Sequence, residues 1–330
     1  MRRRVLVLRA LGLGDVLTAV PALRAVRRGL PDHELVLAAP APMDALVKGA
    51  GLVDRVHPAY GLGPLGWKGP PPDVAVNLHG CGPESHLLLR DLDPGRLVAF
   101  ARAELGVAGP AWVSGEHEVH RWCRLVSSAG WAVDPRDLRL DSPRATNPAP
   151  GAVVVHPGAA APSRRWPVGR FARVANWLQD RDHRVVVTGS PDEVELADQV
   201  AAQAGLPSRA VLAGRTDLAA LSALVAGARL VVSGDTGVAH LAYAHGTPSV
   251  VVFGPTSPDE WGPPASGPHT VVWKGKSRQA AGGGGDPHGT DLDSALAATG
   301  VSEVISAIRD RLEGSRIHDE RRAAAAPLWT

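Results

Sequence analysis

The residues of this sequence that could do chemistry gather in three glycine-containing stretches, each directly after a run of aliphatic residues. The first is Gly12-Leu13-Gly14-Asp15, which follows Val5–Leu8. Its two glycines let a substrate approach the backbone, and the Asp15 carboxylate can accept a proton from a hydroxyl group. Aspartate also favours the position that caps the start of a helix, so Asp15 is either a general base or a helix cap.

The second stretch runs from His156-Pro157-Gly158 to Arg164 and Arg165, just before a predicted helix. Two arginines near a helix N-terminus form a site for an anion, because the guanidinium groups and the unpaired backbone N–H groups both attract negative charge. The alternative is a solvated arginine pair beside Trp166, which then serves as an anchor in the core.

The third stretch is Gly234-Asp235-Thr236-Gly237, which lies between a predicted strand and a predicted helix. The backbone N–H groups of Thr236 and Gly237 can face a diphosphate at the positive end of that helix. His240 lies one turn further on, on the same side of the helix as Thr236. The alternative is an ordinary capped turn with a packed histidine.

These stretches are positioned by short β-branched runs that alternate with amphipathic segments, which predicts a doubly wound α/β fold with parallel sheets. In such sheets ligands bind at the carboxyl ends of the strands, where all three stretches lie. The predicted strands are Val5–Leu8, Glu34–Ala39, Asp73–Leu78, Val153–His156, Arg184–Thr188, Ala210–Leu212, Leu230–Ser233 and Ser249–Phe253. The predicted helices are Val16–Gly29, Pro167–Asp180, Asp192–Ala204, Leu218–Ala226, Gly237–His245 and Val301–Leu312.

The domain organisation is indicated by a segment rich in Pro, Ser and Asn between Asp141 and Gly151. Such a segment is typical of a linker, so we expect one domain at residues 1–145 and a second at 151–312. Residues 313–330 are predicted to form a loosely held C-terminal tail. The run Gly282–Gly285 predicts a mobile loop within the second domain.

Composition excludes several classes of protein. Of the 330 residues, 45% are hydrophobic and 21% are charged, which rules out a disordered chain. The net charge of +2 gives no basic footprint, so no nucleic-acid partner is expected. No apolar run approaches the roughly 18 residues of a membrane span, so no transmembrane segment is expected. Two cysteines, Cys81 and Cys123, are too few for a disulfide framework and fit a cytoplasmic protein.

Several apparent motifs fail on their spacing. The first glycine pair begins like a dinucleotide-binding fingerprint, but Leu17 stands where that motif needs a third small residue. His117 and His120 are three residues apart, whereas the histidines of HExxH zinc enzymes are four apart, so we interpret this pair as the solvated start of a helix. His79 and His86 have no third ligand near them in the sequence. We therefore expect no metal site.

Taken in order, the three stretches resemble glycosyltransferase family 9, the heptosyltransferases, over roughly residues 4–312. One such match is weak, whereas the ordered set is specific. The matching segments are Arg4–Arg9 with Gly14-Asp15-Val16 and Pro21-Ala22-Leu23, then His156-Pro157-Gly158 with Arg164-Arg165-Trp166-Pro167, then Gly234-Asp235-Thr236-Gly237 with His240, Gly246-Thr247-Pro248 and Phe253-Gly254-Pro255-Thr256.

The resemblance implies the GT-B fold, in which two Rossmann-like doubly wound domains face a central cleft. It further implies an acceptor site on the N-terminal domain, a nucleotide-sugar site on the C-terminal domain, and an inverting glycosyltransferase. The donor substrate implied is ADP-heptose, with no cofactor and no metal. Asp15 stands where the family has its catalytic base, and Arg164 where most members have a phosphate-binding lysine. Glu193 matches an acidic residue near the nucleotide ribose.

The candidate site residues follow from these positions. The donor-binding candidates are His156, Gly158, Arg164, Arg165, Gly189, Glu193, Asp235, Thr236, Gly237 and His240, and the acceptor-binding candidates are Gly12, Gly14 and Arg24. The acceptor stays open among a lipopolysaccharide-core-like glycan, another lipid-linked glycan and a small-molecule glycoside, and a peripheral membrane contact is compatible with it. Two other functions also stay open: a nucleotide-sugar epimerase or hydrolase on the same scaffold, and a non-catalytic nucleotide-sugar-binding protein.

Overall fold

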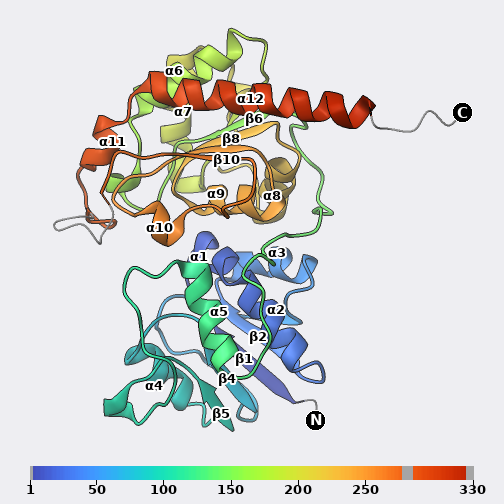
Figure 1. Ribbon diagram of the computed structural model, residues 1–330, viewed down its shortest axis with the longest axis vertical. Coiled ribbons are helices and arrows are strands. Elements are labelled where there is room, and N and C mark those ends of the chain that lie inside the picture. The colour runs from blue at the N-terminus through green and yellow to red at the C-terminus, as the bar shows by residue number, and fades with distance from the viewer. Residues whose placement is uncertain (1–2, 277–284, 325–330) are drawn as a thin grey trace, which may run out of the picture. The chain divides into compact units, whose positions relative to one another are not determined.

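The computed structural model describes residues 3–276 and 285–324 and divides into two compact units (Figure 1). The first unit comprises residues 1–145 and 217–222, and the second comprises 146–216 and 223–330. Of the predicted glycine loop, Gly282–Gly284 lie outside the described residues, as do residues 325–330 of the predicted tail. Both units have the predicted α/β architecture.

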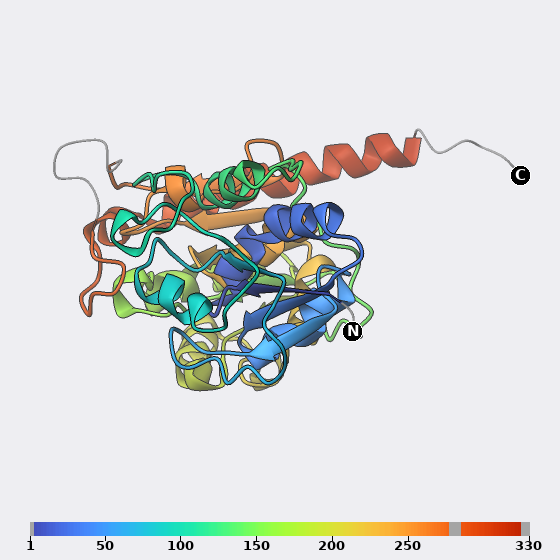
Figure 2. The same cartoon turned by 90° about the horizontal axis from the view of Figure 1, so that it is seen from below.

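The first unit is built on a five-stranded parallel sheet in the order β3-β2-β1-β4-β5. The strand β1 is the central one, and its consecutive large aliphatic residues suit this position because both faces of the strand are covered. Helices α2 and α5 pack together on one face of the sheet (Figures 1 and 2). The strands are β1 (Arg4–Leu8), β2 (Glu34–Ala39), β3 (Arg55–Pro58), β4 (Val74–Asn77) and β5 (Arg96–Val98), and the helices are α1 (Leu13–Thr18), α2 (Val20–Gly29), α3 (Asp44–Gly49), α4 (Glu84–Arg90) and α5 (Glu118–Ser128).

The helix predicted as Val16–Gly29 is in fact two helices, α1 and α2, separated at Ala19. Pro21 in the first turn of α2 explains the break, because proline removes a backbone donor and clashes with the carbonyl four residues earlier. Helix α1 also begins earlier than predicted, at Leu13. Its N-cap is therefore Gly12, and Asp15 lies within the first turn. The interpretation of Asp15 as the helix cap is wrong.

The second unit has a five-stranded parallel sheet in the order β10-β9-β8-β6-β7. The predicted strand Ala210–Leu212 is reduced to an isolated bridge between Val211 and Val187. The strands are β6 (Val153–His156), β7 (Val185–Val187), β8 (Leu230–Gly234), β9 (Ser249–Val252) and β10 (His269–Val272), and the helices are α6 (Val168–Gln179), α7 (Val194–Ala204), α9 (Gly237–His245), α10 (Pro258–Trp261), α11 (Ser294–Ala298) and α12 (Val301–Ala324). Helix α8 (Leu218–Ala226) is divided between the units, since its residues 218–222 belong to the first and 223–226 to the second.

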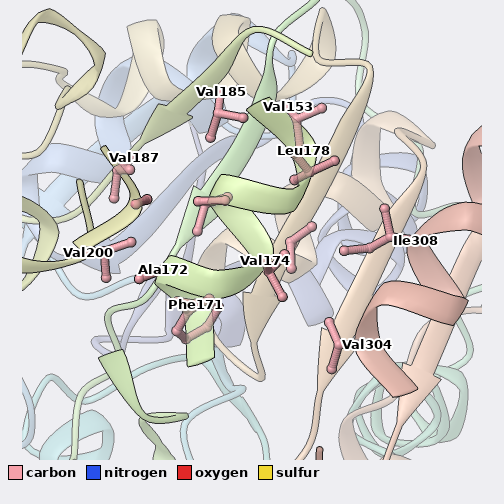
Figure 3. Packing of buried hydrophobic residues seen from close by; sticks show 14 of the residues in the cluster. Val153, Phe171, Ala172, Val174, Leu178, Val185, Val187, Val200, Val304 and Ile308 are labelled. Atoms are coloured by element: carbon pink, nitrogen blue, oxygen red, sulfur yellow. The ribbon is translucent and has the colours of Figure 1, made fainter. Parts of the chain in front are cut away.

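The core of the second unit fills the space between the sheet and the helices α6, α7 and α12 (Figure 3). Phe171 and Leu178 of α6, with Val304 and Ile308 of α12, are fully buried against the β-branched strands. Helix α12 packs on α6, β9 and β10 and continues to Ala324, so residues 313–324 of the predicted tail are helical (Figure 1). In the part of the chain that the structure describes, no helix is both long and apolar enough to cross a membrane.

Candidate functional site

Asp15 lies at the carboxyl end of β1, in the first turn of α1, with 28% of its side chain exposed. From β1 the chain adds β2 and β3 on one side of the sheet, and it then returns to add β4 and β5 on the other side. The point at which the strand order reverses therefore lies between β1 and β4. Ligands of doubly wound sheets bind at this kind of reversal. The geometry therefore leaves the Asp15 carboxylate accessible at the expected ligand position of the first unit.

His79, just after β4, lies on the other side of this reversal. Burial is the main cause that lowers the pKa of His79, and the nearby charge of Arg9 lowers it further, while Asp15 opposes the shift. These interactions place His79 in the electrostatic environment of Asp15, which the sequence pattern alone did not indicate. His86, by contrast, is fully buried and bonds Asn77 and the carbonyl of Phe100, so its role is structural.

The three acceptor-binding candidates differ in where the structure places them. Gly12 approaches the carboxylate closely, since a Cβ atom at that position would lie 3.4 Å from Asp15 Oδ2. Gly14 lies inside the first turn of α1. Arg24 of α2 donates to the Asp137 carboxylate at 2.6 Å and to the carbonyl of Arg139 at 2.7 Å, so its guanidinium ties α2 to the segment that follows α5.

In the second unit, Glu193 is the centre of one group of donor-binding candidates. A Cβ atom at Gly158 would come within 2.2 Å of the Glu193 carboxylate, and one at Gly189 within 3.0 Å of its Cβ, so only glycine fits at 158 without a shift. His156 bonds Thr188 at 3.0 Å, and burial lowers its pKa while Glu193 opposes the shift. Glu193 also accepts from the N–H of Ser190 at 2.8 Å, which caps the turn before α7.

Asp235, which is almost fully buried, is the centre of the other group. Its carboxylate accepts from Arg164 Nη2 at 3.1 Å and from Thr256 Oγ1 at 2.5 Å, and His240 Nε2 lies 3.9 Å from Oδ1. Because Arg164 follows β6 and Asp235 follows β8, this ion pair bridges the reversal point of the second sheet. Arg165 points elsewhere and donates to the carbonyl of Ala159 at 3.0 Å.

The N-terminus of α9 opens directly beside this group. Thr236 is its N-cap and makes no side-chain cap hydrogen bond, and Gly237 is the first helical residue. The first N–H groups of a helix have no partner within the helix, so this turn offers donors to an anion. His240 packs edge-on against Tyr243 and Trp261, with ring centroids 5.3 and 5.9 Å away. Thr256 and Trp261 thus join the site through their contacts with Asp235 and His240, although neither is among the candidates that the sequence indicates.

The prediction that His117 and His120 mark the solvated start of a helix is confirmed, because His117 is the N-cap of α5 and His120 is exposed. Between them, however, Glu118 and Val119 are buried. Glu118 lies 3.2 Å from Arg9 Nη2 and also pairs with Arg121. The signal for this burial was available in the sequence, since Trp122 follows Glu118 by four residues and so shares its helix face. Among the described residues, no cluster of three or more His, Cys, Asp or Glu side chains could hold a metal ion.

Comparison with solved structures identifies the fold of these two units as GT-B. Escherichia coli ADP-heptose LPS heptosyltransferase II aligns with a TM-score of 0.73 at 20% identity, covering 95% of this chain and 99% of that one. A family 9 glycosyl transferase from Veillonella parvula gives the same TM-score at 18% identity, again covering 95% and 99%. These similarities define the class of protein by its fold.

The chain belongs to glycosyltransferase family 9 (heptosyltransferase), whose family model matches residues 110–282. It is 35% identical to lipopolysaccharide heptosyltransferase 2 of E. coli over 120 residues, which is 35% of this chain and 34% of that protein. It is 36% identical to lipopolysaccharide heptosyltransferase 1 of Pseudomonas aeruginosa over 155 residues, which is 45% of this chain and 42% of that protein. The matched part thus spans less than half the length of these curated relatives.

Proposed function

We propose that this protein is an inverting glycosyltransferase that transfers heptose from ADP-heptose to a hydroxyl group of a glycan, a lipid-linked glycan or a small-molecule glycoside. The observation that carries the proposal is the bridge between Arg164 and Asp235 beside the open N-terminus of α9. This arrangement suits a nucleoside diphosphate, because helix N–H groups and a guanidinium both bind phosphate oxygens. Heptose is proposed as the transferred sugar because the curated relatives are heptosyltransferases. ADP is proposed as its carrier because the structure of an E. coli heptosyltransferase of the same fold has been solved with ADP.

In the proposed reaction, Asp15 removes the proton from an acceptor hydroxyl as its oxygen attacks the anomeric carbon. The bond from that carbon to the diphosphate breaks on the opposite face, so the configuration inverts and ADP leaves with the bonding electrons. Arg164 and the N–H groups at Thr236 and Gly237 stabilise the negative charge that develops on ADP. The group around Glu193 holds the nucleotide ribose. No cofactor takes part.

The proposal is tested by incubating the purified protein with ADP-heptose and a panel of acceptors, and by following both ADP release and the mass of the product. We expect ADP release to depend on the acceptor and the acceptor to gain one heptose. Release of free heptose without an acceptor would identify a hydrolase, and an isomerised donor would identify an epimerase. Binding of ADP-heptose without turnover on any acceptor would favour a non-catalytic binding protein.

Metal removal should leave activity intact. Cationic side chains and helix N–H groups take the part that a divalent ion plays in other glycosyltransferases, so the leaving diphosphate has its own counter-charges. We expect the turnover rate measured with excess EDTA to equal that measured with added Mg²⁺. Loss of turnover in EDTA that Mg²⁺ or Mn²⁺ restores would contradict this arrangement.

Arg164→Ala should weaken ADP binding, because it removes a charged hydrogen-bond donor from the proposed diphosphate site. Hydrogen bonds to charged groups contribute about 1.5–3 kcal/mol, and we expect a loss in that range by calorimetry with ADP. Arg165→Ala is the matched control, since its side chain is committed to the carbonyl of Ala159 and should affect ADP binding less. Equal small effects, or a larger loss at Arg165, would place the phosphate elsewhere.

A further inference from the structure

Arg9 is an almost completely buried arginine, 1% exposed, to which the proposed mechanism assigns no part. It follows β1, and side chains of a strand alternate between its two faces. Leu6, Leu8 and Ala10 belong to the core cluster on one face, so Arg9 points to the other face, toward α5. Burial lowers the pKa of Arg9 to about 10, which leaves the guanidinium charged at neutral pH.

The Arg9 guanidinium holds Asp15 at two points. Its Nε donates to the Asp15 carbonyl at 2.9 Å, and its Nη2 lies 3.3 Å from Asp15 Oδ1. The same Nη2 lies 3.3 Å from the hydroxyl of Thr18, in the last turn of α1. A guanidinium is planar and rigid, so these bonds fix the carboxylate relative to the helix that carries it.

Arg9 is itself fixed from two other elements. Its Nη1 donates to the carbonyl of Leu78, just after β4, at 2.5 Å. Its Nη2 pairs with Glu118 of α5 at 3.2 Å, and its guanidinium stacks over the ring of Trp122 at 4.5 Å. Trp122 Nε1 in turn donates to the same Glu118 oxygen at 2.8 Å. Arg9 therefore links Asp15 to both β4 and α5, and its contacts with these two elements fix where it holds the carboxylate.

We propose that Arg9 is the positioning residue of Asp15, and that Glu118 and Trp122 hold Arg9 in place. Arg9 engages Oδ1, and the absence of a side chain at Gly12 leaves the approach to Oδ2 open for an acceptor hydroxyl. Glu118 carries the counter-charge that allows the guanidinium to be buried, and Arg121 shares it. This inference rests on the proposed function, because it takes Asp15 as the general base.

The test replaces Arg9 and Glu118 together, because removing only one of them would leave the other buried without this ion pair. In the variant Arg9→Gln/Glu118→Gln we expect kcat to fall about 10- to 100-fold, the effect of misplacing a catalytic group by about 1 Å. The donor KM should not change, because the donor-binding candidates lie in the second unit. The control is Arg4→Gln/Glu34→Gln, which neutralises the partly exposed pair at the other end of β1 and should leave kcat unchanged.

A double-mutant cycle separates positioning from stability. In the wild-type background Asp15→Asn should cost about 10²–10⁴ in kcat. In the Arg9→Gln/Glu118→Gln background the loss on Asp15→Asn should be smaller by about 10- to 100-fold, since a misplaced base has less to lose. If Asp15→Asn lowered kcat by the same factor in both backgrounds, Arg9 would act on stability alone, and the inference would be overturned. No effect of Asp15→Asn in the wild type would overturn the proposed base, and this inference with it.

A crystal structure of the Arg9→Gln/Glu118→Gln variant tests the same step without any substrate. We expect the Asp15 carboxylate to leave its position while the backbone of β1 and α1 stays in place. If Asp15 keeps its side-chain position without Arg9, the inference is wrong whatever the donor and the acceptor are.

Discussion

Replacing Asp15 with Asn should lower the turnover number by about 10²–10⁴, the usual contribution of a positioned general base. The amide has nearly the same shape as the carboxylate but cannot take the acceptor proton. Donor binding should be almost unchanged, because the proposed diphosphate site lies in the second unit. The measurement is steady-state turnover together with ADP binding by calorimetry.

A matched control for this variant is Asp44→Asn. Like Asp15, Asp44 lies in the first turn of a six-residue helix, but it pairs with Lys48 on the surface. Both changes remove a negative charge from a helix N-terminus, and only the change at Asp15 should affect turnover. Near wild-type turnover of Asp15→Asn, or equal losses in the two variants, would remove Asp15 from its role as base.

Glu118→Ala should destabilise the first unit by about 3–5 kcal/mol, the cost of leaving buried charges without their partner. Two buried arginines, Arg9 and Arg121, lose their ion pairs with Glu118, and Trp122 Nε1 loses its acceptor. The measurement is urea unfolding followed by tryptophan fluorescence. Glu118→Gln should cost less, because its amide oxygen can still accept the hydrogen bond from Trp122.

The control for this stability prediction is Asp44→Ala, which breaks the surface ion pair with Lys48. Both side chains of that pair are more than 40% exposed, and such pairs contribute below about 1 kcal/mol. A loss at Glu118 no larger than the loss at Asp44 would mean that water or a rearranged side chain replaces Glu118 without cost. The ion pairs that Glu118 makes with Arg9 and Arg121 would then contribute nothing to the stability of the first unit.

The sequence alone determined the central strands and the three loops that follow them. Val5–Leu8, Val153–His156 and Leu230–Ser233 are read correctly because a strand covered on both faces must be a continuous aliphatic run. The order of these strands along the chain and the turn residues after each then placed the candidate residues at strand ends. Such signals are local, so they survive without any knowledge of what packs against them.

The edge strands β3, β5 and β10 were missed for a physical reason. Each is short and contains Arg or His, as in Arg55–Pro58 and His269–Val272. An edge strand pairs on one side only and is partly exposed, so its sequence needs no aliphatic run, and polar residues there also discourage pairing with other chains. Such a segment becomes a strand because its backbone pairs with the neighbouring strand, and its own sequence does not indicate this pairing.

The arrangement around Asp15 was likewise decided by tertiary structure. In the sequence, Arg9 only interrupts an apolar run, and Glu118 only begins a charged helix. They are 109 positions apart, and they meet because α5 covers the face of the sheet toward which Arg9 points. The burial of one charge is tolerable only where another chain segment brings the opposite charge to it, and no local pattern encodes that meeting. The sequence therefore supplied the chemical groups of the site, and packing between distant segments decided how they are held.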